Sequence, residues 1–137
     1  MDFPNYFADA DSNYNDSNYV IFGIPYDKTS SFRFGASLAP EKIRQSSWNF
    51  ETYNLKNNVD FKNIKVHDYG DLPVKNDTPS EMIKKVKNFT LKLLKDDKFP
   101  IAARSPFGVR IPPQLPAVVF PRSPGGIIIG LMRRSGL

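Results

Sequence analysis

Residues 19–24 read Tyr-Val-Ile-Phe-Gly-Ile, and Pro25 ends the run. A short continuous stretch of β-branched and aromatic residues is typical of a strand buried on both faces, as in a parallel sheet. A polar segment, residues 26–37, comes next. Residues 39–44, Ala-Pro-Glu-Lys-Ile-Arg, then have the early proline and the first-turn acid of a helix start. This succession predicts a strand, a loop and a helix.

The next sixty residues repeat the same alternation. Residues 64–69 alternate in polarity as a second strand, and Gly70-Asp71 stops it. Residues 78–81, Thr-Pro-Ser-Glu, form a capping box, and apolar residues at helical spacing over 82–94 predict a helix to about residue 97. Residues 99–102 then begin a third strand. Strands alternating with helices indicate an α/β fold with a parallel sheet, and the pattern stops part-way.

Charge is divided unevenly along the 137 residues. Residues 1–100 contain all 14 acidic residues, balanced by 14 of the 19 lysines and arginines, so five arginines in residues 101–137 supply the whole formal charge of +5. The latter segment has no Lys, Asn, Asp or Glu, and it holds half of the 12 prolines. A basic balance confined to dispersed arginines argues against nucleic acid as a partner.

Several classes of protein are disfavoured by composition. The chain has no cysteine, which excludes disulfides and thiolate chemistry. No apolar run approaches the ~20 residues that cross a bilayer. The first residues, Met-Asp-Phe-Pro-Asn, lack the basic and apolar regions of a secretory signal. We therefore expect a cytoplasmic protein with no membrane partner.

Four segments together resemble one enzyme family. Residues 22–36, Phe-Gly-Ile-Pro-Tyr-Asp-Lys-Thr-Ser-Ser-Phe-Arg-Phe-Gly-Ala, resemble the first-strand signature of the arginase/agmatinase ureohydrolases. Residues 39–44 resemble the family's Gly-Pro-x-x-Ile-Arg helix start, and residues 46–53, Ser-Ser-Trp-Asn-Phe-Glu-Thr-Tyr, are similar to the agmatinase branch. Residues 66–72 resemble its Asp-x-Gly-Asp strand end. The resemblance covers about residues 19–101.

This resemblance implies a three-layer α/β/α sheet and a hydrolase that attacks a guanidinium group with water bridging two manganese ions. Agmatinases make putrescine, a polyamine, and urea from agmatine. The family's His and Asp ligands lie in Gly-Gly-Glu-His-Ser, Asp-Ala-His-x-Asp and Ser-x-Asp-x-Asp elements, a donor set that suits manganese. The first should begin where this chain has residues 103–108, Ala-Arg-Ser-Pro-Phe-Gly, and no His or carboxylate follows. We expect no catalytic or metal-binding residues, no bound manganese and no activity from this chain.

Three interpretations of residues 101–137 remain open. The segment could be a Pro-rich tail, a nucleic-acid-binding arm, or out-of-frame or cloning-derived sequence. We favour the last, because the family pattern ends where the composition changes. The prolines disfavour regular elements over residues 103–126, while residues 126–132 are apolar enough for a short strand.

A few polar residues invite a functional interpretation. His67 is the only histidine, but one histidine with scattered carboxylates is a weak metal site, and a structural role is favoured. Asp68 and Asp71 could be an acid/base pair, although holding backbone N–H groups at the strand end is the favoured role. For Arg33, an ion pair within the loop or across a subunit interface is favoured over an anion site.

The sequence therefore predicts residues 1–14 as a flexible lead, 15–102 as a partial ureohydrolase α/β domain, and 103–137 as an irregular tail outside the family pattern. The predicted function is agmatinase-like by resemblance and inactive in this chain. The alternative is a non-enzymatic fragment that associates with full-length ureohydrolase subunits, which form homo-oligomers in the family. A half sheet should leave an open edge on its third strand, so a marginally stable, aggregation-prone chain is expected.

Overall fold

The computed structural model describes residues 4–29, 35–49, 51–104, 118–119 and 128–132. β1 (Tyr19–Gly23) leads through a loop and the 3-10 turn η1 (Ala36–Leu38) into α1 (Ala39–Ser47). A hairpin of β2 (Tyr53–Asn54) and β3 (Val59–Asp60) and the turn η2 (Phe61–Asn63) precede β4 (Val66–Asp71). α2 (Pro79–Lys95) and β5 (Phe99–Arg104) follow, and β6 (Val118–Val119) and β7 (Ile128–Met132) complete the described elements.

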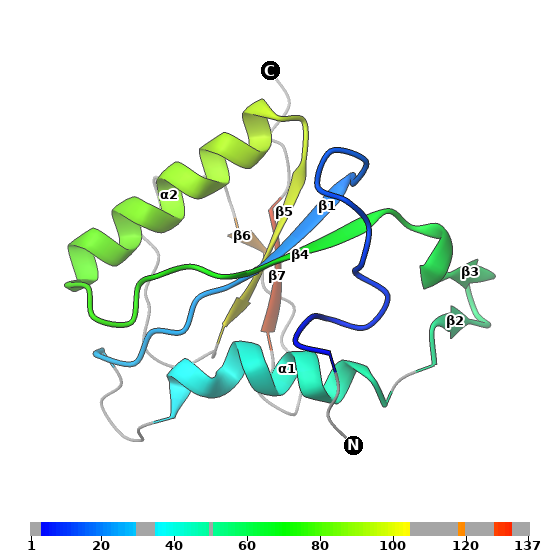
Figure 1. Cartoon of the computed structure of the whole chain (residues 1–137), viewed down its shortest axis with the longest axis horizontal. Coiled ribbons are helices and arrows are strands. Elements are labelled where there is room, and N and C mark those ends of the chain that lie inside the picture. The colour runs from blue at the N-terminus through cyan, green and yellow to red at the C-terminus, as the bar shows by residue number, and fades with distance from the viewer. Residues whose placement is uncertain (1–3, 30–34, 50, 105–117, 120–127, 133–137) are drawn as a thin grey trace.

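The main sheet has the strand order β4-β1-β5-β7-β6. β1 runs parallel to both of its neighbours, with Tyr19 opposite Val66 on one side and opposite Phe99 on the other. α1 and α2 lie on opposite sides of this sheet (Figure 1). The expected α/β class, with parallel strands and helices on both faces, is confirmed.

Period-two alternation along β1 divides the core between those two faces. Val20 and Phe22, both fully buried, pack with α2. Ile21, on the other face, packs with Ile43 of α1. The run of apolar residues is therefore continuous because side chains on both faces of this strand are buried in the core.

α2 begins at the capping box that the sequence predicts. The hydroxyl of Thr78 accepts a hydrogen bond from the backbone N–H of Glu81 at 3.3 Å, and the backbone N–H of Thr78 donates to Glu81 Oε2 at 2.8 Å. These bonds, the backbone bond from Thr78 first, lower the pKa of the Glu81 carboxyl. Among the described residues, no helix combines the length and hydrophobicity needed to cross a membrane.

The amino-terminal segment corrects one prediction. Residues 1–14 were expected to be a flexible lead, which is wrong for residues 4–14. Asp11 forms an antiparallel bridge with His67, and the backbone N–H of Ser12 donates to the carbonyl of Val66 at 3.0 Å. Ala8 and Ala10 are buried. Small apolar residues among the polar ones let this segment pack on the outer edge of β4.

The third strand also differs from expectation. β5 continues to Arg104, beyond the predicted boundary at 102, and its far edge is not open. β7 pairs with it antiparallel, with Ala102 opposite Gly130, and corresponds to the short strand allowed at 126–132. β6 pairs with β7 inside the stretch expected to lack regular elements. An unpaired edge leaves N–H and C=O groups without partners, and an apolar run that can reach it satisfies them without a crossover helix.

Candidate functional site

The carboxyl ends of β1 and β4 meet at one edge of the sheet, where the loops of an open α/β fold gather their polar groups. Gly23 ends β1 and is paired with Asp71, the last residue of β4. A Cβ on Gly23 would collide with Asp71 Oδ1 and would lie 2.8 Å from the Cβ of Pro40. Glycine is required here because the Asp71 carboxylate and α1 both approach the strand backbone.

Arg44 of α1 joins the two aspartates of β4. Its Nε and Nη2 bind Asp68 Oδ2 and Oδ1 at 2.8 and 2.9 Å, and its Nη1 binds Asp71 Oδ1 at 2.6 Å. The side chains of Arg44 and Asp68 are 4% and 1% exposed, whereas Asp71 is 38% exposed. Burial by itself would lower the pKa of Arg44, but the hydrogen bonds and charges of the two aspartates raise it overall. The guanidinium therefore stays charged and bidentate.

Asp68 holds more than the arginine. Its Oδ2 also accepts a hydrogen bond from the backbone N–H of Phe7 at 2.7 Å, and its Oδ1 accepts one from Gly70 N–H at 2.9 Å. One carboxylate thus fastens the amino-terminal segment, α1 and the end of β4. The prediction that it holds backbone N–H groups is confirmed for Asp68, while Asp71 bonds a guanidinium.

The loop after β1 is anchored by further polar bonds. Asp27 accepts hydrogen bonds from the backbone N–H groups of Gly35 and Ala36 at 2.6 and 3.3 Å, which closes the loop on the start of η1. The hydroxyl of Tyr26 donates to the carbonyl of Asp77 at 3.1 Å. Burial, followed by the nearby acidic charges, raises the pKa of Tyr26. Arg33 lies outside the described residues.

His67 has the structural surroundings expected for it. Its Nδ1 lies 2.8 Å from the carbonyl oxygen of Ser12, and its ring makes an edge contact with Tyr14 at 5.7 Å between centroids. Within the described parts of the chain, no three or more His, Cys, Asp or Glu side chains are grouped so as to hold a metal ion. Because the Asp68 oxygens are engaged by Arg44 and backbone donors, these residues do not fit manganese.

Arg44 is the residue at this site whose role sequence reasoning missed. In the sequence pattern it stands only as the end of a helix-start motif. The available signal was its position on the helix: Arg44 lies at helical spacing from the apolar residues of α1. The buried residues of α1 are Pro40, Ile43, Arg44 and Ser47. An arginine on the buried stripe of a helix requires an anionic partner, and β4 carries two aspartates, Asp68 and Asp71.

Residues 17–103 match the model of the arginase family. The chain belongs to the arginase family. It is 34% identical over 90 residues to an agmatinase of Halalkalibacterium halodurans, covering 66% of this chain and 31% of that protein. The agmatine ureohydrolase of Thermoplasma volcanium superimposes with a TM-score of 0.69 and 32% identity, over 74% of this chain and 34% of that one.

A second arginase-superfamily structure is similar in fold. The Trypanosoma cruzi formiminoglutamase with Mn²⁺ gives a TM-score of 0.56 at 27% identity, over 73% of this chain and 36% of that chain. The chain spans about a third of the length of these relatives. Gly23, Arg44, Asp68 and Asp71 all fall inside the arginase-family match.

Proposed function

We propose that this chain is the amino-terminal scaffold segment of an agmatinase-type ureohydrolase and does not hydrolyse a guanidinium substrate by itself. The observation that carries the proposal is the Arg44–Asp68–Asp71 cluster. It uses the two carboxylates of β4 for ion pairs and backbone bonds, with the side chain of Asp68 only 1% exposed. Asp71 lies beside Gly23 at the end of β1, and the loop that follows β1 would border the ligand crevice in a complete α/β enzyme.

The substrate part of the proposal is supported by the names of the relatives, agmatinase and agmatine ureohydrolase. Manganese is supported by the Trypanosoma cruzi formiminoglutamase, whose crystal structure holds Mn²⁺. We assign the metal ligands to the part of such an enzyme that this chain does not match. A role in polyamine biosynthesis and a cytoplasmic location belong to the same proposal.

The first experiment measures urea released from agmatine by the purified chain with added MnCl₂. The agmatinase of Halalkalibacterium halodurans serves as the positive control under identical conditions. We expect the chain to release no urea above the protein-free background. Urea formation that depends on stoichiometric manganese would contradict the scaffold assignment.

The second experiment tests the family function directly with a chimera. Residues 17–103 replace the matching segment of that agmatinase, and the chimera should retain manganese-dependent activity. Arg44→Met within the chimera should abolish most of it, whereas Lys42→Met, an exposed change on the same helix, should not. A folded, inactive chimera would refute the proposal.

Association with full-length ureohydrolase subunits is the second candidate function. The observation in its favour is the β2–β3 hairpin, which exposes Tyr53, Leu55 and Val59, with Leu55 84% exposed. Size-exclusion chromatography of the chain mixed with a full-length subunit should show co-elution. Leu55→Ser should weaken it, and separate elution of the wild-type chain at high micromolar concentration would rule it out.

A further inference from the structure

A cavity of about 500 Å³ lies between the amino-terminal segment, the end of α1 and the loop that leads into β2. Since α1 runs from the carboxyl edge of the sheet toward its amino edge, this cavity is at the opposite end of α1 from the loop after β1. Its volume falls in the range of small-molecule sites, roughly 300–1,000 Å³. Neither Tyr26 nor Asp27 of the loop after β1 lines it.

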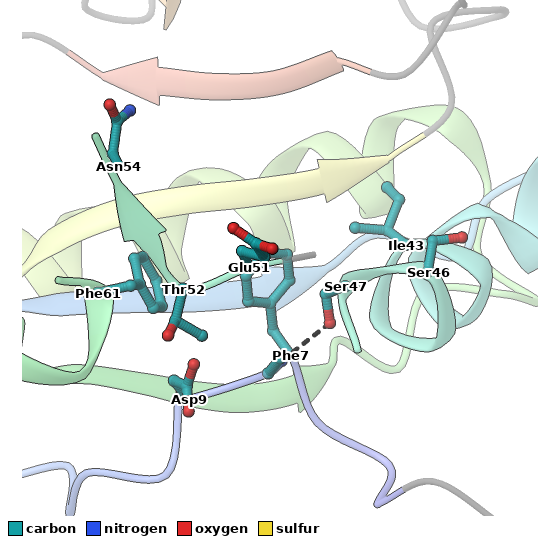
Figure 2. A pocket seen from close by; sticks show the side chains of 10 residues that line it. Phe7, Asp9, Ile43, Ser46, Ser47, Glu51, Thr52, Asn54 and Phe61 are labelled. Atoms are coloured by element: carbon teal, nitrogen blue, oxygen red, sulfur yellow. Dashed lines mark hydrogen bonds between the residues drawn. The ribbon is translucent and has the colours of Figure 1, made fainter. Parts of the chain in front are cut away.

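The walls of the cavity combine apolar surface with acidic groups. Phe7, Ile43 and Phe61 supply side-chain carbon, and the two rings lie 6.1 Å apart between centroids. Asp9 and Glu51 supply the charge. Figure 2 shows Asp9 and Phe61 on one side of the cavity and Ile43 on the α1 side, with Glu51 between them. None of the described residues that line the cavity is Lys, Arg or His.

Asp9 is held in place by its neighbours. Its backbone has φ 60°, and the backbone N–H of Ala8 donates to Ser47 Oγ at 2.8 Å. The next residue, Ala10, donates from its N–H to the carbonyl of Phe7 at 2.9 Å. The backbone at Asp9 is therefore held by hydrogen bonds of the residues on both sides of it.

The Asp9 carboxylate has an unmet requirement. Its Oδ2 is buried and has no hydrogen-bond partner. Burying a carboxylate oxygen without a donor is costly, and native structures satisfy nearly all such atoms. A positively charged donor would offset more of this burial cost than a neutral donor, because hydrogen bonds between ionised groups are about twice as strong as neutral ones.

We propose that this cavity binds a small organic cation, an alkylammonium whose ammonium group donates to Asp9 and whose hydrocarbon body packs against Phe7, Phe61 and Ile43. Glu51, at the exposed side, adds a second attraction for positive charge. A neutral ligand offers Asp9 at most an uncharged donor, whose hydrogen bond to the carboxylate is weaker than that of an ammonium, and an anion is repelled by both carboxylates. The aromatic rings add a favourable face for the cation.

The test uses the 137-residue chain and isothermal titration calorimetry with hexylamine, 1-hexanol and hexanoate at neutral pH. Each of the three probes has six carbon atoms, and they differ in the charge of the head group. Hexylammonium should bind at least about tenfold more tightly than the other two, because a hydrogen bond from a charged donor is stronger than one from a neutral donor. Equal binding of hexylamine and hexanol, or no binding of hexylamine at millimolar concentration, would overturn the proposal.

Asp9→Asn provides the matched change. Asn tolerates a positive φ and preserves the shape of the side chain, so the fold should survive. The variant should lose about tenfold in affinity for hexylammonium. Asp11→Asn, an exposed change of equal charge in the same segment, should bind like wild type. If both variants bind equally well, Asp9 is not the cation's partner and the proposal fails. The urea assays are independent of this result.

Discussion

Replacing Arg44 by Met is the most informative perturbation of the scaffold. The change keeps much of the hydrophobic stem but leaves Asp68, 1% exposed, without its cation. Removing one partner of a buried ion pair costs about 3–5 kcal/mol. Asp68 retains the backbone N–H donors of Phe7 and Gly70, which offset part of the loss. We therefore expect a value near the lower end, about 3 kcal/mol.

That loss is large against a total of about 5–15 kcal/mol for a small domain. It should lower the melting temperature by roughly 12–24 °C at about 4–8 °C per kcal/mol. Urea denaturation followed by circular dichroism measures the free energy of unfolding, and a thermal melt measures the shift. Lys42→Met, exposed on the same helix, should stay within about 0.5 kcal/mol of wild type.

Two further variants separate the charge from the packing. Asp71→Asn should cost about 1 kcal/mol or less, because Asp71 is 38% exposed and solvent screens its pair. Adding Asp68→Asn to Arg44→Met should recover part of the loss, since the orphaned charge is then gone. If Arg44→Met lies within about 1 kcal/mol of Lys42→Met, the cluster does not stabilise the fold as argued.

Three smaller predictions follow from local contacts. Thr78→Ala should cost about 1 kcal/mol in urea denaturation through loss of the α2 cap. The contribution of Glu81 to stability depends on pH, because its pKa is lowered in the folded state. This contribution is present above the unfolded pKa, near 4.3, and is lost as pH falls through the folded pKa. A difference in stability between wild type and Thr78→Ala that does not shrink in acid would contradict this. Gly23→Ala should lower stability by roughly 1–3 kcal/mol in a thermal melt, because its Cβ would collide with Asp71 Oδ1, and an unchanged melt would show that the strand end yields. Burial, then a hydrogen bond and charge from Asp96, raises the pKa of Tyr14 to about 12. The neutral phenol therefore contributes stability that is fully present below pH ~10 and is lost as pH rises through about 12; an ultraviolet difference titration of wild type against Tyr14→Phe should show that transition, and a transition near 10 would refute it.

The sequence alone determined the local elements and the family. The apolar run at 19–24, the proline-led start of α1 and the Thr78 capping box each depend on residues close together in the sequence. Such local patterns can be recognised without the tertiary structure. The parallel sheet followed from their alternation. The arginase-family motifs agree with the match over residues 17–103.

Only the tertiary structure decided which polar groups meet. Arg44 and Asp68 are separated by 24 positions, and Phe7 and Asp68 by 61, and no periodicity connects them. Residues 4–14 were expected to be flexible because their composition is polar, yet the edge of β4 gives their backbone N–H and C=O groups partners. The edge of β5 likewise recruits β7 in the antiparallel sense. The unpaired N–H and C=O groups of an edge strand can pair with any extended segment that lies beside them. Sequence composition does not show which segment lies there.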